Sequence, residues 1–254
     1  MLRVIITGAS SGIGAALARH YAQHGAVLGL IARRKTGLER LAEKLSVPVR
    51  IYPLDVRDSA ALQAAAADFL EHHGCPDIVI ANAGVSVGTL TEFAEDMTAF
   101  RDVIDINLVG MVHTFQPFIA AMRAARRGKL VGIASVAGYR GIPGAAAYSA
   151  SKAAAIAYLE SLRVELRASG VKAITICPGY IATPMTAQNP YPMPFILSAE
   201  AAARSIAGVV RRGRSFAVIP WQMAIVARVL HVLPNWLYDR LFGRAPRKPR
   251  RPVG

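Results

Sequence analysis

The sequence predicts an open α/β fold, in which one domain is built on a doubly wound parallel sheet with helices on both faces. Three observations lead to this fold class. Short apolar runs recur along the 254 residues without polar alternation, as in strands that are buried on both faces. Helical segments separate these runs, and no linker or internal repeat interrupts the pattern. A glycine-rich turn directly follows the first apolar run.

Seven strands are expected, each an apolar run with turn residues nearby. They cover residues 2–6, 26–31, 49–52, 78–81, 129–134, 172–177 and 216–219. Helices are expected near residues 12–24, 36–45, 58–73, 95–126, 148–169 and 199–212. Strand and helix in alternation imply right-handed crossovers in a seven-stranded parallel sheet. We therefore place the core domain at residues 1–219.

The glycine turn TGASSGIG opens the first predicted helix. Gly8, Gly12 and Gly14 have no Cβ, so the backbone can turn tightly and approach a ligand closely. A helix that begins here points its unpaired amides and the positive end of its dipole at the turn, which suits a phosphate. The position between a strand and a helix favours a dinucleotide site over a turn of purely structural importance.

Tyr148 and Lys152 stand four residues apart in a predicted helix, so their side chains share one face. A free tyrosine titrates near pH ~10, and its use as an acid or base near neutrality requires about 4 kcal/mol of stabilisation of its anion. A neighbouring ammonium group supplies such stabilisation. By itself this spacing also fits any surface helix. Together with the glycine turn, it predicts catalytic chemistry.

The sequence contains no pattern that indicates a metal site or a disulfide. The two cysteines, Cys75 and Cys177, have no metal-binding neighbourhood, and the six histidines are scattered. Two reduced thiols are typical of a cytoplasmic protein. The first strand begins at residue 2, so we expect no signal peptide.

The motifs together resemble the short-chain dehydrogenase/reductase family, in its shorter single-domain form with a Rossmann fold. The resemblance covers residues 1 to about 220. It is carried by Thr7 to Gly14, Asp55 in PLDV, Asn82 to Gly84 in ANAG, Asn107 in INLVG, Ser135 before VAG, the pair Tyr148 and Lys152, and Pro178 to Thr183 in PGYIAT. Ala81 departs from the pattern, because the family often has an asparagine there.

The resemblance implies a role for each of four catalytic residues. Tyr148 would be the general acid in carbonyl reduction and the general base in alcohol oxidation. Lys152 would lower the pKa of Tyr148 and hold the nicotinamide ribose. Ser135 would donate to the substrate oxygen as negative charge develops there. Asn107 would help to position a water molecule behind the lysine.

The resemblance also implies a cofactor site. Asp55 would lie near the adenine ring and Thr183 near the nicotinamide carboxamide. The expected cofactor-binding residues are Gly8, Ser10, Ser11, Gly12, Ile13, Gly14, Arg33, Arg34, Asp55, Val56, Asn82, Ala83, Gly84, Tyr148, Lys152, Pro178, Gly179, Ile181 and Thr183.

The end of the second strand favours NADP(H) over NAD(H). An acidic residue normally accepts hydrogen bonds from the adenosine ribose at this position, but here it is Ala32. Arg33 and Arg34 follow, and guanidinium groups suit a 2′-phosphate. The alternative is that the two arginines form part of a solvated surface.

Residues 184–198 are expected to form a substrate lid, as in the family. Its apolar side chains favour an apolar substrate: Tyr191, Met193, Phe195, Ile196 and Leu197. A loop stiffened by prolines and packed on its own domain would have the same composition.

The charge is concentrated at the C-terminus. Residues 1–200 carry 19 basic and 15 acidic side chains. Residues 201–254 carry 11 basic side chains and a single acidic one, Asp239, so this segment contributes +10 of the net charge of +14. Residues 220–243 are predicted to be an amphipathic helical extension, and residues 244–254 a basic, disordered tail. This composition fits docking on an anionic membrane, and it fits equally well helices that cover the core or a partner subunit. The basic run has no interleaved aromatic residues, so we expect no nucleic acid.

The predicted function is NADP(H)-dependent oxidation of a secondary alcohol or reduction of a carbonyl. The alternative is a catalytically silent NADP(H)-binding sensor or scaffold. Intact Ser135, Tyr148 and Lys152 argue against it, because a sensor needs no phenol with a tuned pKa. The resemblance makes a homodimer the default expectation. The location would be cytoplasmic, with peripheral attachment to the membrane.

Overall fold

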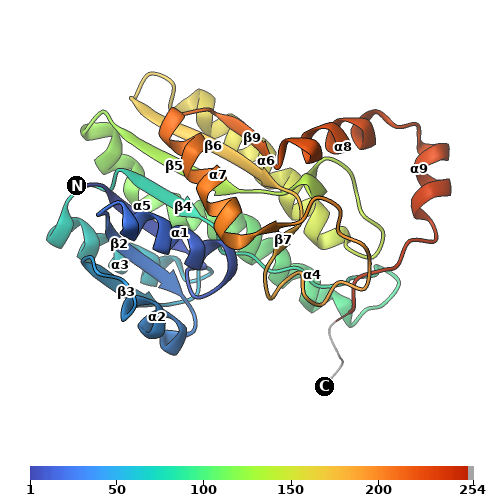
Figure 1. The fold of residues 1–254 in the computed structure, drawn as a ribbon, viewed down its shortest axis with the longest axis horizontal. Coiled ribbons are helices and arrows are strands. Elements are labelled where there is room, and N and C mark those ends of the chain that lie inside the picture. The colour runs from blue at the N-terminus through green and yellow to red at the C-terminus, as the bar shows by residue number, and fades with distance from the viewer. Residues whose placement is uncertain (251–254) are drawn as a thin grey trace.

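Seven parallel strands form one sheet through the centre of the protein (Figure 1). The computed structural model describes residues 1–250. In spatial order the strands are β3 (Val49–Pro53), β2 (Val27–Ala32), β1 (Arg3–Thr7), β4 (Ile78–Ala81), β5 (Gly128–Ile133), β6 (Val171–Pro178) and β9 (Phe216–Ile219). The predicted seven-stranded sheet is confirmed, and each strand begins and ends within one residue of its predicted limits.

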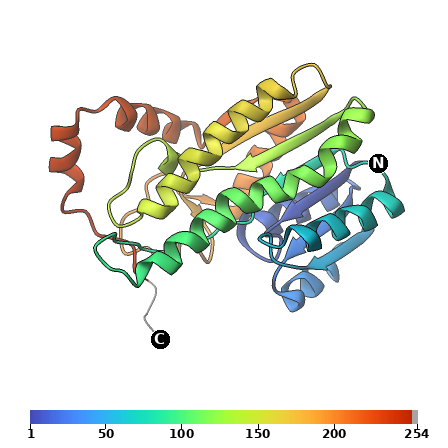
Figure 2. The ribbon, with the colours of Figure 1, turned by 180° about the vertical axis from the view of Figure 1, so that it is seen from behind.

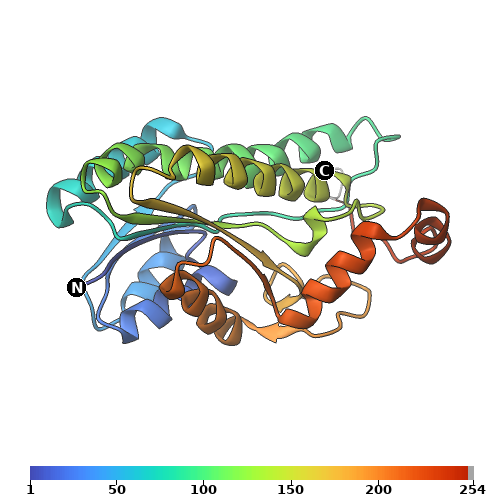
Figure 3. The same ribbon diagram turned by 90° about the horizontal axis from the view of Figure 1, so that it is seen from above.

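Helices cover both faces of the sheet (Figure 3). The helices that contribute to the core on one face are α1 (Gly12–Gln23), α2 (Lys35–Ala42) and α7 (Ala199–Arg212). Those on the other face are α3 (Ser59–His73), α5 (Gly110–Ala124) and α6 (Ala146–Glu165), of which α5 and α6 lie side by side (Figure 2). Each layer buries its own apolar cluster, so the strands are apolar on both faces as the unbroken runs predict.

The order of strand addition reverses between β1 and β4. From β1 the chain adds β2 and β3 on one side, and it then returns to add β4, β5, β6 and β9 on the other. Connections after β1 and β4 therefore leave the sheet toward opposite faces. This divergence opens a crevice at the carboxyl ends of the two strands, where open α/β sheets bind ligands.

The helix expected over residues 95–126 is interrupted. It consists of α4 (Asp96–Ile104), a π-helical turn η1 (Asp105–Val109) and α5. A π-turn widens the backbone locally and is frequent at functional sites. Here it carries Asn107, whose side chain hydrogen-bonds with both backbone groups of Val85.

One helical run in the described residues, Asp96–Ala124, is long and apolar enough by length and composition alone to cross a membrane. Its α5 part packs Phe115, Phe118 and Met122 into the core. A helix in the core of a water-exposed domain can be as long and as apolar as a membrane span. The packing of these side chains against the sheet accounts for the apolar character of the run.

Beyond β9 the chain leaves the sheet and forms α8 (Trp221–Val232) and α9 (Asn235–Phe242), which project from one end of the domain (Figure 1). We call residues 220–243 the C-terminal arm. Arg140 holds the arm in place, because its guanidinium donates to the carbonyl oxygens of Leu230 (2.8 Å) and Leu233 and to Asn235 Oδ1 (2.8 Å). The guanidinium also lies 4.2 Å from the centre of the Tyr238 ring.

The expectation of a disordered basic tail is wrong for residues 244–250. The tail returns to the domain beside residues 86–96, where Lys248 Nζ donates to Ser86 Oγ at 2.9 Å. Arg250 contacts Asp96 and Glu95 and lies 3.7 Å from the centre of the Phe93 ring. Acidic partners far away in the sequence account for the order, and composition alone could not reveal them. Residues 251–254, the rest of the predicted tail, lie outside the described residues.

We expect replacement of Arg140 by alanine to loosen the arm and leave the sheet intact. The substitution removes charge-assisted hydrogen bonds, each of which contributes about 1.5–3 kcal/mol. Amide hydrogen exchange in α8 and α9 should therefore accelerate by about tenfold or more. The control is Arg163→Ala on α6, whose closest carboxylate partner lies 3.9 Å away. Equal exchange rates in both variants would contradict the anchoring role of Arg140.

Candidate active site

The glycine turn between β1 and α1 forms the floor of the crevice. Gly8 and Gly12 have φ values of +67° and +55°, which other residues rarely adopt. A Cβ on Gly14 would lie 2.3 Å from the carbonyl oxygen of Gly8, so only glycine lets the helix approach the turn this closely. The side chain of Ser11, the N-cap of α1, makes no capping hydrogen bond. The turn and the helix start thus form a cradle that suits a phosphate.

Thr7 and Asn82 join the glycine turn to the end of β4. The buried Thr7 hydroxyl oxygen accepts from the backbone amides of Asn82 and Ala83, both at 3.1 Å. In return, Asn82 Nδ2 donates to the carbonyl oxygens of Thr7 (3.0 Å) and Gly8 (3.4 Å). Ala81, where the family often has asparagine, is buried in β4 and leaves this connection intact.

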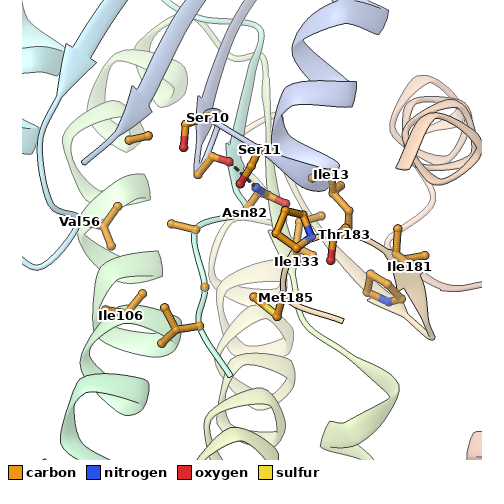
Figure 4. A pocket seen from close by; sticks show the side chains of 18 of the residues that line it. Ser10, Ser11, Ile13, Val56, Asn82, Ile106, Ile133, Ile181, Thr183 and Met185 are labelled. Carbon is orange, nitrogen blue, oxygen red and sulfur yellow. Dashed lines mark hydrogen bonds between the residues drawn. The ribbon is translucent and has the colours of Figure 1, made fainter. Parts of the chain in front are cut away.

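A cavity of about 390 Å³ opens over this turn at the carboxyl ends of the strands. In Figure 4, Ser10, Ser11 and Asn82 gather at the glycine turn, with Val56 and Ile106 on one side and Ile181 and Thr183 on the other. Of the expected site residues, all line the cavity except Gly14 and Asn107. Gly14 acts through close packing, and Asn107 lies behind the wall.

Several lining residues were not expected from the sequence. Pro184, Met185 and Thr186, which begin the expected lid, also line the cavity. The residues that were not expected are neighbours of the motifs: Ala32, Leu54, Val85, Ile106, Ile133 and Ala134. Their apolar side chains carry no chemical signal. Adjacency to a motif at a strand end was the one feature that could have identified them.

Ser135, Tyr148 and Lys152 meet at one end of the cavity. Ser135 follows β5 and caps the short 3₁₀ turn η2 (Val136–Gly138), with its hydroxyl accepting from the amide of Ala137 at 3.1 Å. Tyr148 and Lys152 project from the first turns of α6. Lys152 Nζ donates to the carbonyl oxygen of Ile133 at 2.8 Å and lies 5.8 Å from the centre of the Tyr148 ring.

The electrostatics differ from the expectation that Lys152 lowers the pKa of Tyr148. Burial raises the pKa of Tyr148, and a hydrogen bond with Ser135 opposes this only in part. Burial lowers the pKa of Lys152 to about 8. The Lys152 ammonium is held at the Ile133 carbonyl. In the protein alone it therefore does not offset the rise that burial causes in the pKa of Tyr148.

The Asn107 amide is fully engaged within the protein. Its Oδ1 accepts from the amide of Val85 at 2.8 Å, and its Nδ2 donates to the carbonyl oxygen of Val85 and to Ser151 Oγ, both at 3.0 Å. These bonds connect η1 to the loop after β4 and to α6. The expected role in holding a water molecule stays a prediction.

The far end of the cavity carries the residues expected at the adenosine. Arg33 and Arg34 follow β2, are exposed, and have no ion pair within residues 1–250. Asp55 receives hydrogen bonds from Arg57, which lower the pKa of its carboxyl. Two guanidinium groups at the rim therefore remain available to a ligand.

The expected lid begins at the cavity. Its two ends are joined, because β7 (Ile181–Ala182) pairs with β8 (Leu197–Ser198). Thr186 Oγ1 donates to the carbonyl oxygen of Ile181 at 2.5 Å, which holds Met185 against the cavity. Further along, the rings of Tyr180 and Tyr191 lie 6.4 Å apart. The described residues contain no group of three or more His, Cys, Asp or Glu side chains that could hold a metal ion.

Comparison with known proteins identifies relatives along most of the chain. The short chain dehydrogenase family matches residues 3–192. An uncharacterised oxidoreductase of Myxococcus xanthus is 39% identical, over 92% of this chain and 94% of its own length. A protein of Arabidopsis thaliana named 11-beta-hydroxysteroid dehydrogenase-like 2 is 35% identical, over 94% of this chain and 81% of its own.

Solved structures show the same Rossmann-like fold with either cofactor. A short-chain dehydrogenase/reductase of Burkholderia phymatum in complex with NAD has a TM-score of 0.83 and 25% identity, and the match covers 100% of this chain and 98% of that one. An alcohol dehydrogenase of Thermococcus sibiricus complexed with 5-hydroxy-NADP has a TM-score of 0.78 and 27% identity, with 86% and 96% covered.

We expect the buried ammonium of Lys152 to destabilise the protein in the absence of cofactor. Lowering the pKa of Lys152 from 10.5 to about 8 reduces the free energy of unfolding by about 3 kcal/mol when the ammonium is charged. This cost is present in full below pH 8, and it disappears as the pH rises to about 10.5. Lys152→Met should therefore unfold at higher urea concentration than the native chain below pH 8, and the difference should vanish near pH 10.5. The exposed Lys44→Met is the control. A difference independent of pH would contradict the cost of the buried charge.

Proposed function

This chain belongs to the short-chain dehydrogenase/reductase family, and we propose that it is an NADP(H)-dependent oxidoreductase acting on a carbonyl or secondary alcohol of an apolar substrate. It is an oxidoreductase that uses a nicotinamide cofactor. The preference for NADP(H) and the substrate class are the proposed parts. One observation carries the first of them: two free guanidinium groups stand at the rim of the cavity where a carboxylate would select NAD(H).

The cradle of glycines fits the cofactor that the family uses. A Cβ on Gly12 would come within 3.1 Å of Thr183 Cγ2, and one on Gly8 within 2.9 Å of the Ala83 Cα, so side chains there would fill the space a pyrophosphate needs. We assign the pyrophosphate to the amides of Ser11 to Ile13 and the ribose phosphate to Arg33 and Arg34. When bound, NADP(H) supplies or accepts the hydride.

Side chains of the protein would donate and accept the proton. The Tyr148 hydroxyl would protonate the substrate oxygen in reduction and take the proton back in oxidation. The Ser135 hydroxyl, which lines the same end of the cavity as Tyr148, would donate to the same oxygen as its negative charge grows. Lys152 lies one helical turn from Tyr148, where its ammonium could stabilise the phenolate if it turned from Ile133.

The apolar substrate class rests on the walls beyond the catalytic groups. Met185 lines the cavity, and Phe195 and Ile196 of the expected lid are exposed apolar side chains, which we assign to contacts with the substrate. We also assign a homodimer to the faces of α5 and α6, as in family members, where Val164 is an exposed apolar side chain. The silent sensor remains the second candidate, and turnover distinguishes the two.

We expect Tyr148→Phe to reduce kcat by about 10²–10⁴-fold while NADPH still binds, because it removes the proton donor but little volume. The measurement is NADPH oxidation with a panel of cyclic and long-chain ketones. Tyr158→Phe on the same helix, whose ring packs in the core, is the matched control and should retain activity. Native protein that binds NADPH but turns over no ketone or alcohol would support the sensor.

We expect the double substitution Arg33→Ala and Arg34→Ala to reduce kcat/KM for NADPH by about 10²-fold and to leave kcat/KM for NADH nearly unchanged, because charge-assisted bonds to the phosphate are lost. Arg40→Ala, an exposed arginine on α2, is the control. A native enzyme that prefers NADH would refute the proposed cofactor.

A further inference from the structure

The outward face of α8 is an unbroken apolar stripe. Trp221, Ile225, Val229 and Val232 have exposed fractions between 52% and 77%. At about 100° per residue they lie within an arc of about 80°, so they form one face of the helix. The opposite face carries the buried Met223 and Ala227. A stripe of this size on the surface of a domain marks an interaction site.

The rest of the C-terminal segment adds one more exposed tryptophan and several cations. Trp236 at the start of α9 is exposed as well. Residues 220–250 carry six basic side chains and one acid, Asp239. The exposed basic side chains are Arg228, Arg240, Arg244 and Arg247. Arg228 lies at the border of the stripe, where an arginine stem can pack along apolar groups while the guanidinium reaches polar ones.

The arm is held rigidly enough to present this face. Met223 packs against Gly179, where an added Cβ would lie 2.6 Å from Met223 Cγ. Arg140 binds the carbonyl ends of α8, and the Tyr238 hydroxyl donates to the carbonyl oxygen of Gly141 at 2.6 Å. Met223 and Arg140 thus connect the inner side of the arm to the cavity wall and to the loop before α6, and the apolar side is left outward.

We propose that the C-terminal arm docks the protein on an anionic lipid membrane through Trp221, Ile225, Val229, Val232 and Trp236. Tryptophan and aliphatic side chains insert at the boundary of headgroups and acyl chains, and arginines bind lipid phosphates. The charge selects this partner over a second copy, because residues 220–250 carry six basic side chains and one acid, and two copies of this segment would repel each other. The inference does not depend on the reaction that the site performs.

The experiment is flotation of the full-length protein with vesicles. Native protein should float with vesicles of equimolar phosphatidylglycerol and phosphatidylcholine, should bind at least tenfold less to phosphatidylcholine alone, and should be released in part by high salt. The double variant Ile225→Glu and Val229→Glu should lose binding by tenfold or more. The control, Leu2→Glu with Gln23→Glu, makes the same change in net charge at two exposed positions outside the arm, before β1 and at the end of α1, and should lose far less.

A second variant separates insertion from charge attraction. Val229→Lys adds a positive charge but removes an apolar side chain, so the proposal expects weaker flotation, whereas attraction by charge alone expects stronger flotation. Circular dichroism melting checks that each variant folds.

Three results would overturn the proposal. The first is soluble native protein that stays unbound by anionic vesicles, and the second is equal flotation of the stripe variant and its control. The third is light scattering that shows the stripe variants dissociating a dimer while the native chain does not float. Binding to duplex DNA without binding to vesicles would assign the cations to nucleic acid instead. Failure of flotation would leave the proposed dehydrogenase untouched, because turnover is measured separately.

Discussion

The hydrogen bonds between Thr7 and Asn82 are the constraint on which the site depends. They join the ends of β1 and β4 where strand addition reverses direction, and they hold the carbonyl of Gly8 toward Asn82. The Thr7 hydroxyl accepts from two amides and donates to Ile80, so it is satisfied while fully buried. Buried polar groups with all their partners make an arrangement unique. The glycine cradle, and with it the entrance to the cavity, keeps its shape through this contact.

The end of the cavity where Ser135, Tyr148 and Lys152 meet carries an electrostatic cost. Lys152 is buried with a carbonyl as its hydrogen-bond partner, and burial also raises the pKa values of Tyr148 and Cys177, the latter to about 12. Only the ammonium carries a cost, because burial disfavours its charged form, whereas the phenol and the thiol stay neutral near pH 7. Strained or costly groups in a cavity are typical of functional sites. Asn107 supports this end of the cavity by joining η1 to Val85 and to Ser151 on α6.

The arm and tail show how contacts far apart in the sequence organise the rim of the site. Arg140, five residues after Ser135, holds α8 and α9, and the tail beyond them reaches Ser86 and Asp96 after β4. A Cβ on Gly144 would lie 2.9 Å from Arg247 Cβ, so the tail also passes the loop before the catalytic helix. The C-terminal residues therefore belong to the surroundings of the cavity, although composition suggested a disordered tail.

Local patterns determined the sheet, the glycine turn and the pairing of Tyr148 with Lys152, because apolar runs, absent Cβ atoms and helical spacing act within a few residues. They also predicted most of the residues that line the cavity, because motifs at the carboxyl ends of parallel strands must meet at one edge. Tertiary structure alone decided which way the Lys152 ammonium points, the π-turn at Asn107 and the order of the basic tail. These features depend on partners such as Ile133, Val85 and Asp96, which are distant in sequence and have no signature of their own. The pKa of Tyr148 was also decided by the tertiary structure, because burial is a property of the packed fold and the spacing of residues does not reveal it.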